Sequence, residues 1–120
     1  GAPRFRSVFV PVKNVAVQAE FYRETLGLSQ TVPDPSSDLT DAHWVAFDTG
    51  ACKLALHSGG EDGPSEDGPA FVFGAEDLEA VHRHLSGKGV ELSEITEPSP
   101  GLKMCSGFDP EGFLFWIEQV

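Results

Sequence analysis

Alternating apolar and polar positions divide most of this chain into short strands. Val8, Val10 and Val12 occupy every second position, a period typical of a strand with one buried face. Such runs, separated by turn residues, predict strands at residues 6–12, 28–32, 44–48, 52–57, 70–73, 90–96, 103–108 and 113–118. Pro11 has no backbone N–H, so the first strand is expected to lie at an edge, bulge or end there.

Two segments have helical spacing instead. Apolar side chains recur every three or four positions over residues 15–26, where Asn14 is the expected N-cap. Leu78, Val81 and Leu85 repeat this spacing and predict a second helix that begins at Glu76 or Asp77. Each helix follows a strand and precedes three more.

The chain contains a duplication. Phe47-Asp48-Thr49-Gly50 and Phe108-Asp109-Pro110-Glu111-Gly112 are similar turns, and a shift of 61 residues superimposes Phe47 on Phe108. We expect the same shift to place Val10 on Phe71. The sequence therefore predicts a single α+β domain of two βαβββ repeats, about residues 4–57 and 70–120, joined by a linker over 58–69. Paired repeats should form a curved, cup-like mixed sheet with the helices on its outer face.

Alternation also sorts the strand residues into two faces. One face is uniformly bulky and apolar and should pack under the helices: Val8, Val10, Val12, Val45, Phe47, Leu54, Leu56, Phe71, Phe73, Phe113, Phe115 and Ile117. The other face mixes small, aromatic and ionisable side chains, as a ligand-binding surface does. From it we predict a ligand site made of Phe9, Trp44, His57, Trp116 and Glu118. The alternative is that this face packs against another subunit or against the other half of the chain.

The acidic composition of the chain disfavours two classes of binding partner. The chain has 8 basic and 19 acidic side chains and a net charge of −11, which disfavours binding to nucleic acid or to an anionic membrane surface. Cys52 and Cys105 lack the spacing of a zinc or redox motif, so we expect reduced thiols and a cytoplasmic protein.

Several motifs together resemble a known superfamily. Val12-Lys13-Asn14-Val15, the segment FYRETLGL at residues 21–28 and the two Phe-Asp turns are similar to the signature of the vicinal oxygen chelate superfamily. That superfamily includes glyoxalase, bleomycin-resistance proteins and extradiol dioxygenases. The resemblance covers nearly the whole chain and implies two βαβββ units, usually completed in a homodimer. It leaves the function open because this fold hosts many chemistries.

The resemblance also indicates where family enzymes hold a divalent metal ion. Counting from the matching motifs, the ligand positions fall on Ser7, Lys53, Ala70 and Trp116. These side chains do not form the set of imidazoles and carboxylates that a catalytic ion needs. We therefore expect no cofactor and no metal at the family position.

The preferred hypothesis is a binding protein rather than an enzyme. It would sequester a small aromatic, preferably cationic, ligand without a metal, as bleomycin-resistance proteins do in antibiotic resistance. We also expect it to be a homodimer. The alternative is a glyoxalase-type lyase, isomerase or dioxygenase whose displaced metal site uses His57 and Glu118. A third reading is an accessory subunit whose concave face binds a protein or peptide.

Overall fold

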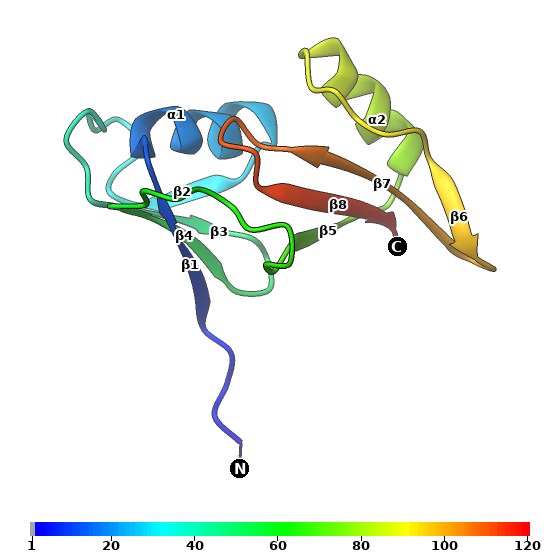
Figure 1. Cartoon of the computed structure of the whole chain (residues 1–120), viewed down its shortest axis with the longest axis horizontal. Coiled ribbons are helices and arrows are strands. Elements are labelled where there is room, and N and C mark those ends of the chain that lie inside the picture. Colours follow the sequence, from blue (N-terminus) through cyan, green and yellow to red (C-terminus); the bar gives the residue numbers. More distant parts are fainter. Residues whose placement is uncertain (1) are drawn as a thin grey trace. The chain divides into compact units, whose positions relative to one another are not determined.

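The computed structural model describes residues 2–120, and it divides into two compact units. The first unit ends at Gly63 and the second runs over Pro64–Val120. The division falls inside the Gly- and Pro-rich segment over residues 58–69. Each unit has its own four-stranded sheet and its own helix (Figure 1).

The first unit has the element order βαβββ. Its elements are β1 (Ser7–Val12), α1 (Val15–Glu20), a π-helical turn η1 (Phe21–Thr25), β2 (Ser29–Val32), β3 (Trp44–Asp48) and β4 (Lys53–Ser58). The strand order in the sheet is β1-β4-β3-β2, with β1 parallel to β4 and the other pairs antiparallel. Pro11 accordingly lies in an edge strand, where its missing N–H costs no ladder bond between central strands.

The second unit repeats this arrangement. Its elements are β5 (Phe71–Ala75), α2 (Leu78–Gly87), β6 (Thr96–Ser99), β7 (Leu102–Phe108) and β8 (Leu114–Gln119). The strand order is β5-β8-β7-β6, again with the first and last strands parallel. The prediction of an α+β fold with two βαβββ units is confirmed, because β4 and β8 occupy equivalent positions.

Equivalent N-caps begin the two helices. The Asn14 side chain accepts a hydrogen bond from the Val17 N–H, and the Asp77 side chain accepts one from the Ala80 N–H, both at 3.1 Å. These bonds satisfy backbone donors that the first helical turn leaves without a partner. α1 then lies against β3 and β4, and α2 lies against β8.

The strand faces follow the predicted alternation. Phe115 and Ile117 in β8 are 0% and 3% exposed, whereas Trp116 between them is half-buried on the opposite face. In β1 the residues on the Val8 side are likewise less exposed than Ser7 and Phe9. The apolar residues with almost no exposed surface are Val12, Ala19, Tyr22, Val45, Phe47, Leu54, Ala55, Leu56, Leu78, Leu85, Cys105, Phe115 and Ile117. The apolar face of each sheet thus forms the core of its unit.

The single helix predicted over residues 15–26 was wrong in its second half. α1 ends at Glu20 and continues as η1, in which the Leu26 N–H donates to the Phe21 carbonyl at 3.0 Å, five residues back. The backbone hydrogen bond that follows the helix also spans one residue more in the first unit than in the second. The Leu28 N–H reaches the Tyr22 carbonyl, whereas the Val90 N–H reaches the Leu85 carbonyl. The π-helical turn therefore inserts one extra residue into the first unit.

The shift of 61 residues predicted for the duplication was wrong for the first strand and the helix of each unit. The N-caps at residues 14 and 77 and the register of the first strands require a shift of 63 there, so Val10 corresponds to Phe73 and not to Phe71. The shift of 61 holds only for the later strands. Between the N-cap and the Phe-Asp turn, the first unit is therefore two residues longer than the second. One of these residues lies in the helix, and the other lies in the segment between the helix and that turn.

One strand position was also wrong. We predicted a strand over residues 90–96, but β6 is Thr96–Ser99 and all four of its residues are exposed. The preceding segment keeps only isolated bonds to β7, such as the Ser93 N–H to the Ser106 carbonyl at 2.9 Å. An edge strand without a buried face has no hydrophobic alternation from which it could be predicted.

The repeated Phe-Asp turns have a structural role. The Asp109 carboxylate, only 5% exposed, accepts hydrogen bonds from the N–H groups of Glu111 and Phe113, both at 3.0 Å. The Asp48 carboxylate accepts one from the Gly50 N–H at 2.8 Å. Gly50 and Gly112 both have a φ of 88°, a left-handed conformation that favours glycine. The motif that marks the duplication therefore closes hairpins.

No helix within residues 2–120 has the length and apolar character needed to cross a membrane.

Candidate functional site

Three aromatic rings lie close together on the first sheet, each near the other two. The ring centroids of Phe9 and Trp44 are 5.9 Å apart, those of Phe9 and His57 are 6.3 Å apart, and those of Trp44 and His57 are 5.8 Å apart. The planes of Trp44 and His57 are nearly perpendicular, at 79°. We call these three residues the ring cluster. Three of the five predicted site residues are thus brought together.

Strand register explains the ring cluster. Trp44 in β3 lies directly opposite His57 in β4, and Phe9 in β1 lies opposite Ala55, two residues from His57. Side chains two residues apart share a face, so the rings gather on one side of the sheet. Below them, Ala46 and Ala55 are 4% and 0% exposed. The three rings therefore lie next to small, buried residues of the same sheet face.

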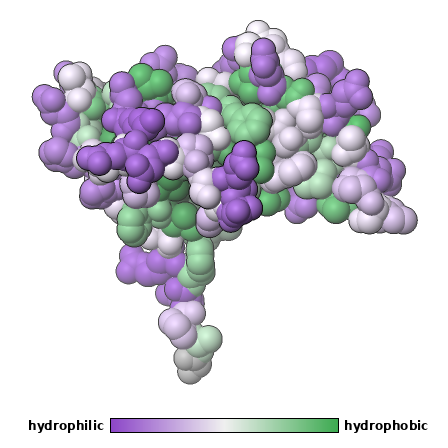
Figure 2. Space-filling view, in the orientation of Figure 1, coloured by the Kyte–Doolittle hydropathy of each residue, from purple (hydrophilic) through white to green (hydrophobic). Residues whose placement is uncertain are grey.

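The ring cluster is open to solvent. Phe9 is 59% exposed and Trp44 is 39% exposed, so both present apolar surface to water in this unit. Apolar side chains interrupt the polar surface in the space-filling view (Figure 2). The large exposed ones are Phe5, Phe9, Val17, Val32, Trp44, Val72, Phe108 and Val120. An exposed aromatic group of this kind marks a binding surface more often than a solvated one.

The remaining two predicted site residues lie together in the second unit. Trp116 and Glu118 are two positions apart in β8 and share its half-buried face. Val72, which is 56% exposed, lies opposite Trp116 in β5. Within residues 2–120 the Glu118 carboxylate forms no ion pair. The second unit therefore also presents an indole and a carboxylate on the face away from its core.

A β-bulge places a further residue beside the ring cluster. Gln30 pairs with Phe47 and Val32 pairs with Ala46, so β2 has one more residue than β3 over this stretch. The bulge moves Val32, 48% exposed, onto the Ala46 side, which is also the face of Trp44. Bulges often redirect a side chain next to a functional site.

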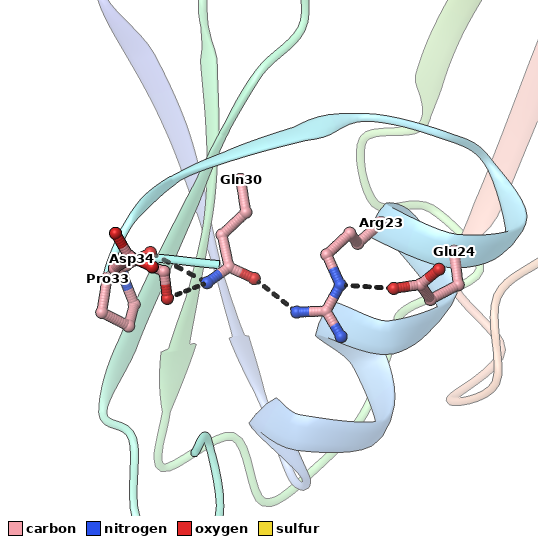
Figure 3. A network of polar contacts seen from close by, with 5 residues as sticks. All are labelled: Arg23, Glu24, Gln30, Pro33 and Asp34. Carbon is pink, nitrogen blue, oxygen red and sulfur yellow. Dashed lines mark hydrogen bonds and ion pairs between the residues drawn. The ribbon is translucent and has the colours of Figure 1, made fainter. Parts of the chain in front are cut away.

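The segment after β2 is anchored by a buried amide. Gln30 is 6% exposed, and its Oε1 accepts a hydrogen bond from Arg23 Nη1 at 2.8 Å (Figure 3). Its Nε2 donates to the Pro33 carbonyl at 2.9 Å. Arg23 Nε also pairs with Glu24 at 2.8 Å. A side chain from the π-helical turn thus holds the beginning of the loop over residues 33–43.

This loop and Trp44 border an open hollow of about 430 Å³, which we call the Trp44 hollow. It is lined by Val32, Pro33, Ser37, Asp38, Thr40, Asp41, Ala42, His43 and Trp44. Hydrogen bonds from the hydroxyl and then the N–H of Thr40 hold the pKa of the Asp38 carboxyl below its ordinary value. The alternation of apolar and polar residues did not predict this hollow. Its only signal was the acidic, proline-containing composition of the loop.

A second hollow is also lined by residues 40–43. Its volume is about 460 Å³, and its lining includes Lys13, Asp41, His43 and Ser58. The Nδ1 atom of His43 lies 2.9 Å from the Ser58 hydroxyl oxygen. The Ser58 N–H also donates to the His43 carbonyl at 2.9 Å, so this pair ties the end of the loop to β4.

The residues at the family's metal positions do not fit a metal ion. Ser7 and Lys53 are directly paired across β1 and β4, so a serine and a lysine occupy neighbouring positions there. The indole N–H of Trp116 is a donor and cannot ligate a cation. Across residues 2–120 no three His, Cys, Asp or Glu side chains gather closely enough to hold a metal ion. Metal ligands of the usual kind are therefore lacking at these positions.

Comparison with known proteins identifies the family of the fold. A family model described as Glyoxalase/Bleomycin resistance protein/Dioxygenase superfamily matches residues 4–117. No curated protein matches the sequence.

Similar solved structures have diverse descriptions. An antibiotic-binding protein, TnmS3 from Streptomyces sp. CB03234, has a TM-score of 0.79 and 20% identity, over 98% of this chain and 96% of that one. A lactoylglutathione lyase from Agrobacterium tumefaciens has a TM-score of 0.74 and 16% identity, over 98% and 94%. An integron cassette protein from the mobile metagenome of the Halifax Harbour sewage outfall has a TM-score of 0.78 and 22% identity, over 99% and 100%. At such identities the likeness concerns the fold alone.

Proposed function

Because this chain belongs to the Glyoxalase/Bleomycin resistance protein/Dioxygenase superfamily, we propose that it binds and sequesters a small planar aromatic molecule without a metal ion. The ring cluster carries this proposal. Phe9, Trp44 and His57 are in mutual contact on the solvent side of a sheet whose other face is the core. Stacking on such rings contributes about 0.5–1.5 kcal/mol per aromatic pair beyond the burial of area.

The second unit supports the same ligand class. Trp116 gives this unit an indole of its own, and Glu118 gives it a carboxylate on the same face of β8. The net charge of −11 favours a ligand with a positive charge. The antibiotic-binding protein with the same fold makes an aromatic antibiotic a reasonable first ligand to test, by analogy of fold.

Binding without catalysis is the simpler function for these residues. The metal-dependent alternative requires His57 and Glu118 as ligands, and neither belongs to a group of three metal-ligating side chains within residues 2–120. A lyase or dioxygenase of this superfamily would need such a group.

Single-tryptophan variants test the proposal. The chain has only two tryptophans, so Trp116→Phe leaves Trp44 as the only indole, and its fluorescence reports on the ring cluster. We expect quenching and a thermal shift with at least one member of a panel of planar aromatic antibiotics. Phe9→Ala should weaken that binding about fivefold. No quenching and no thermal shift with any planar compound would contradict the proposal.

A matched variant controls for general effects. Val17 in α1 is 47% exposed and lies on the helix, away from the ring cluster. Val17→Ala removes exposed apolar surface as Phe9→Ala does, and it should leave the affinity unchanged.

A further inference from the structure

The side-chain amide of Gln30 is bonded at both ends. Its Oε1 accepts a hydrogen bond from Arg23 Nη1 at 2.8 Å (Figure 3). Its Nε2 donates to the carbonyls of Pro33 and Asp34, at 2.9 and 3.4 Å. A guanidinium can only donate and a carbonyl can only accept, so the orientation of the amide is fixed. Gln30 therefore links the π-helical turn to the first two residues of the loop over residues 33–43.

The second unit has an apolar side chain where the first has Gln30. The backbone bonds that follow the two helices match Leu28 with Val90. Two residues further on, Gln30 therefore corresponds to Leu92. Gln30 pairs with a residue of β3, and Leu92 packs against β7, where a Cβ atom on Gly107 would lie 2.8 Å from Leu92 Cδ2. The same position thus accepts leucine in one unit and a bonded amide in the other.

A buried amide at a position that accepts leucine indicates a role beyond stability. Replacing a buried polar pair by apolar side chains of similar volume is often neutral for the free energy of unfolding. What the amide of Gln30 adds is a fixed geometry, because hydrogen bonds are directional whereas apolar contacts are not. The geometry that it fixes is the path of the chain from β2 into the loop.

The chain that Gln30 holds leads to the ring cluster. The bulge after Gln30 turns Val32 to the face of Trp44, and the Thr31 hydroxyl in this bulge donates to the Ala46 carbonyl at 3.3 Å. Val32, just before the loop, and Trp44, just after it, line the same hollow. A displacement of the beginning of the loop would therefore change the surroundings of the Trp44 ring.

We propose that Gln30 is a positioning residue of the first unit, which holds the bulge and the loop over residues 33–43 in the arrangement that presents Trp44 for ligand binding. Arg23 acts through Gln30 by fixing the orientation of its amide. This inference rests on the proposed function, and it assigns control of the affinity of that site to a residue on the core face of the sheet, opposite Phe47.

Gln30→Leu tests the inference on the protein alone. It introduces the residue that the second unit has, so the unfolding temperature should change little. The Ser37 N–H, which donates to the Asp34 carbonyl at 2.9 Å, should exchange with solvent about tenfold faster. The Ala42 N–H should change less, because its acceptor is the carbonyl of the buried Leu39. Hydrogen exchange followed by NMR measures both amides.

The ring cluster should respond with the loop. In a Trp116→Phe background, where Trp44 is the only indole, acrylamide should quench the fluorescence about 1.5-fold more strongly after Gln30→Leu. The neutral planar compound 2-naphthol serves as the binding probe. By calorimetry, Gln30→Leu should weaken its binding about fivefold, because a loosened loop must be ordered again when the ligand binds.

Gln30→Glu separates the two ends of the amide. A carboxylate still accepts from Arg23, but it cannot donate to the Pro33 carbonyl and repels it. This variant should therefore show the fast Ser37 exchange and the weakened 2-naphthol binding of Gln30→Leu, although the bond to the arginine is kept.

Gln119→Glu in β8 is the matched control. The Gln119 amide also accepts from an N–H, that of Leu78, and donates to a carbonyl, that of Glu76, but it belongs to the second unit. The substitution should lower the unfolding temperature and leave both the Ser37 exchange and the affinity for 2-naphthol unchanged.

The outcomes separate this inference from the proposed function. Unchanged Ser37 exchange in Gln30→Leu, or an equal acceleration in Gln119→Glu, would overturn the positioning role. Fast exchange with unchanged 2-naphthol affinity would also overturn it, because the loop would then not control the site. If 2-naphthol does not bind the unmodified protein, Trp44 quenching decides, and equal quenching with and without Gln30→Leu overturns the role. The proposed function fails only if the panel of planar antibiotics also gives no quenching and no thermal shift.

Discussion

Trp44 and His57 face each other across the β3–β4 pair, with ring centroids 5.8 Å apart and planes at 79°. Directly opposite residues of an antiparallel pair lie close enough for such an edge contact. Phe9 joins them from the edge strand β1, so the cluster depends on both the parallel and the antiparallel pairing of β4. This contact lies at the centre of the proposed binding surface.

The first prediction concerns the second tryptophan. Trp116→Ala should weaken the binding of an aromatic ligand by about 1–3 kcal/mol, from lost burial and stacking. Fluorescence titration of Trp44→Phe, in which Trp116 is the remaining indole, measures that contact independently. Unchanged affinity together with an unquenched Trp116 would restrict the site to the ring cluster.

Stability should distinguish the two faces of β8. Phe115 is 0% exposed, so Phe115→Ala should lower the free energy of unfolding by about 3–5 kcal/mol through lost burial and a cavity. Trp116 is half-buried on the other face, so Trp116→Ala should cost clearly less. Urea unfolding of both variants gives the comparison. An equal or reversed order would mean that the Trp116 face is itself a core.

We predict a homodimer. The exposed Val72, Phe108 and Val120 leave apolar surface outside the ring cluster in contact with water, which association of two copies would cover. Sedimentation velocity at micromolar concentration should show a species of twice the mass of the chain. A single monomeric species over that range would count against the dimer.

The purified protein should not contain a stoichiometric metal ion. The positions expected to bind one carry Ser7, Lys53, Ala70 and Trp116, whose side chains are poor ligands. Elemental analysis after growth with added Zn, Fe, Mn and Ni tests this. The metal-dependent alternative would be supported by one equivalent of any of these metals that is lost in His57→Ala.

The two cysteines should differ in reactivity. Cys105 is 0% exposed, and desolvation by burial raises the pKa of its thiol. The folded state therefore favours the neutral thiol, and this contribution to stability is present below the ordinary thiol pKa and is lost as the pH rises through the folded value. In Cys52→Ser, the remaining thiol should react with a disulfide reagent at pH 8 only after denaturant is added.

The half-buried Cys52 provides the comparison. In Cys105→Ser it should be labelled in the native protein, because the reagent can reach it. Rapid native labelling of Cys105 would show that its strand opens far more easily than its burial indicates.

Local pattern determined much of this fold. The alternation around Phe115 and Trp116 placed one inside and one outside, because successive side chains of a strand point to opposite faces. The paired Phe-Asp turns revealed the duplication, because a left-handed glycine and a bonded aspartate are local requirements of a hairpin. The ring cluster likewise followed from the shared face of Phe9, Trp44 and His57.

Only the tertiary structure decided the features that depend on contacts between distant segments. The π-helical turn differs from an α-helix by one residue, which leaves the apolar spacing almost unchanged, so the sequence predicted one continuous helix. β6 was misplaced because its exposed residues carry no alternation. The Trp44 hollow needs the bulge beside Val32 and the bond from Gln30 to the Pro33 carbonyl. A sequence pattern records which residues share a face, whereas a hollow forms where a folded loop meets another strand, and that meeting is set by packing.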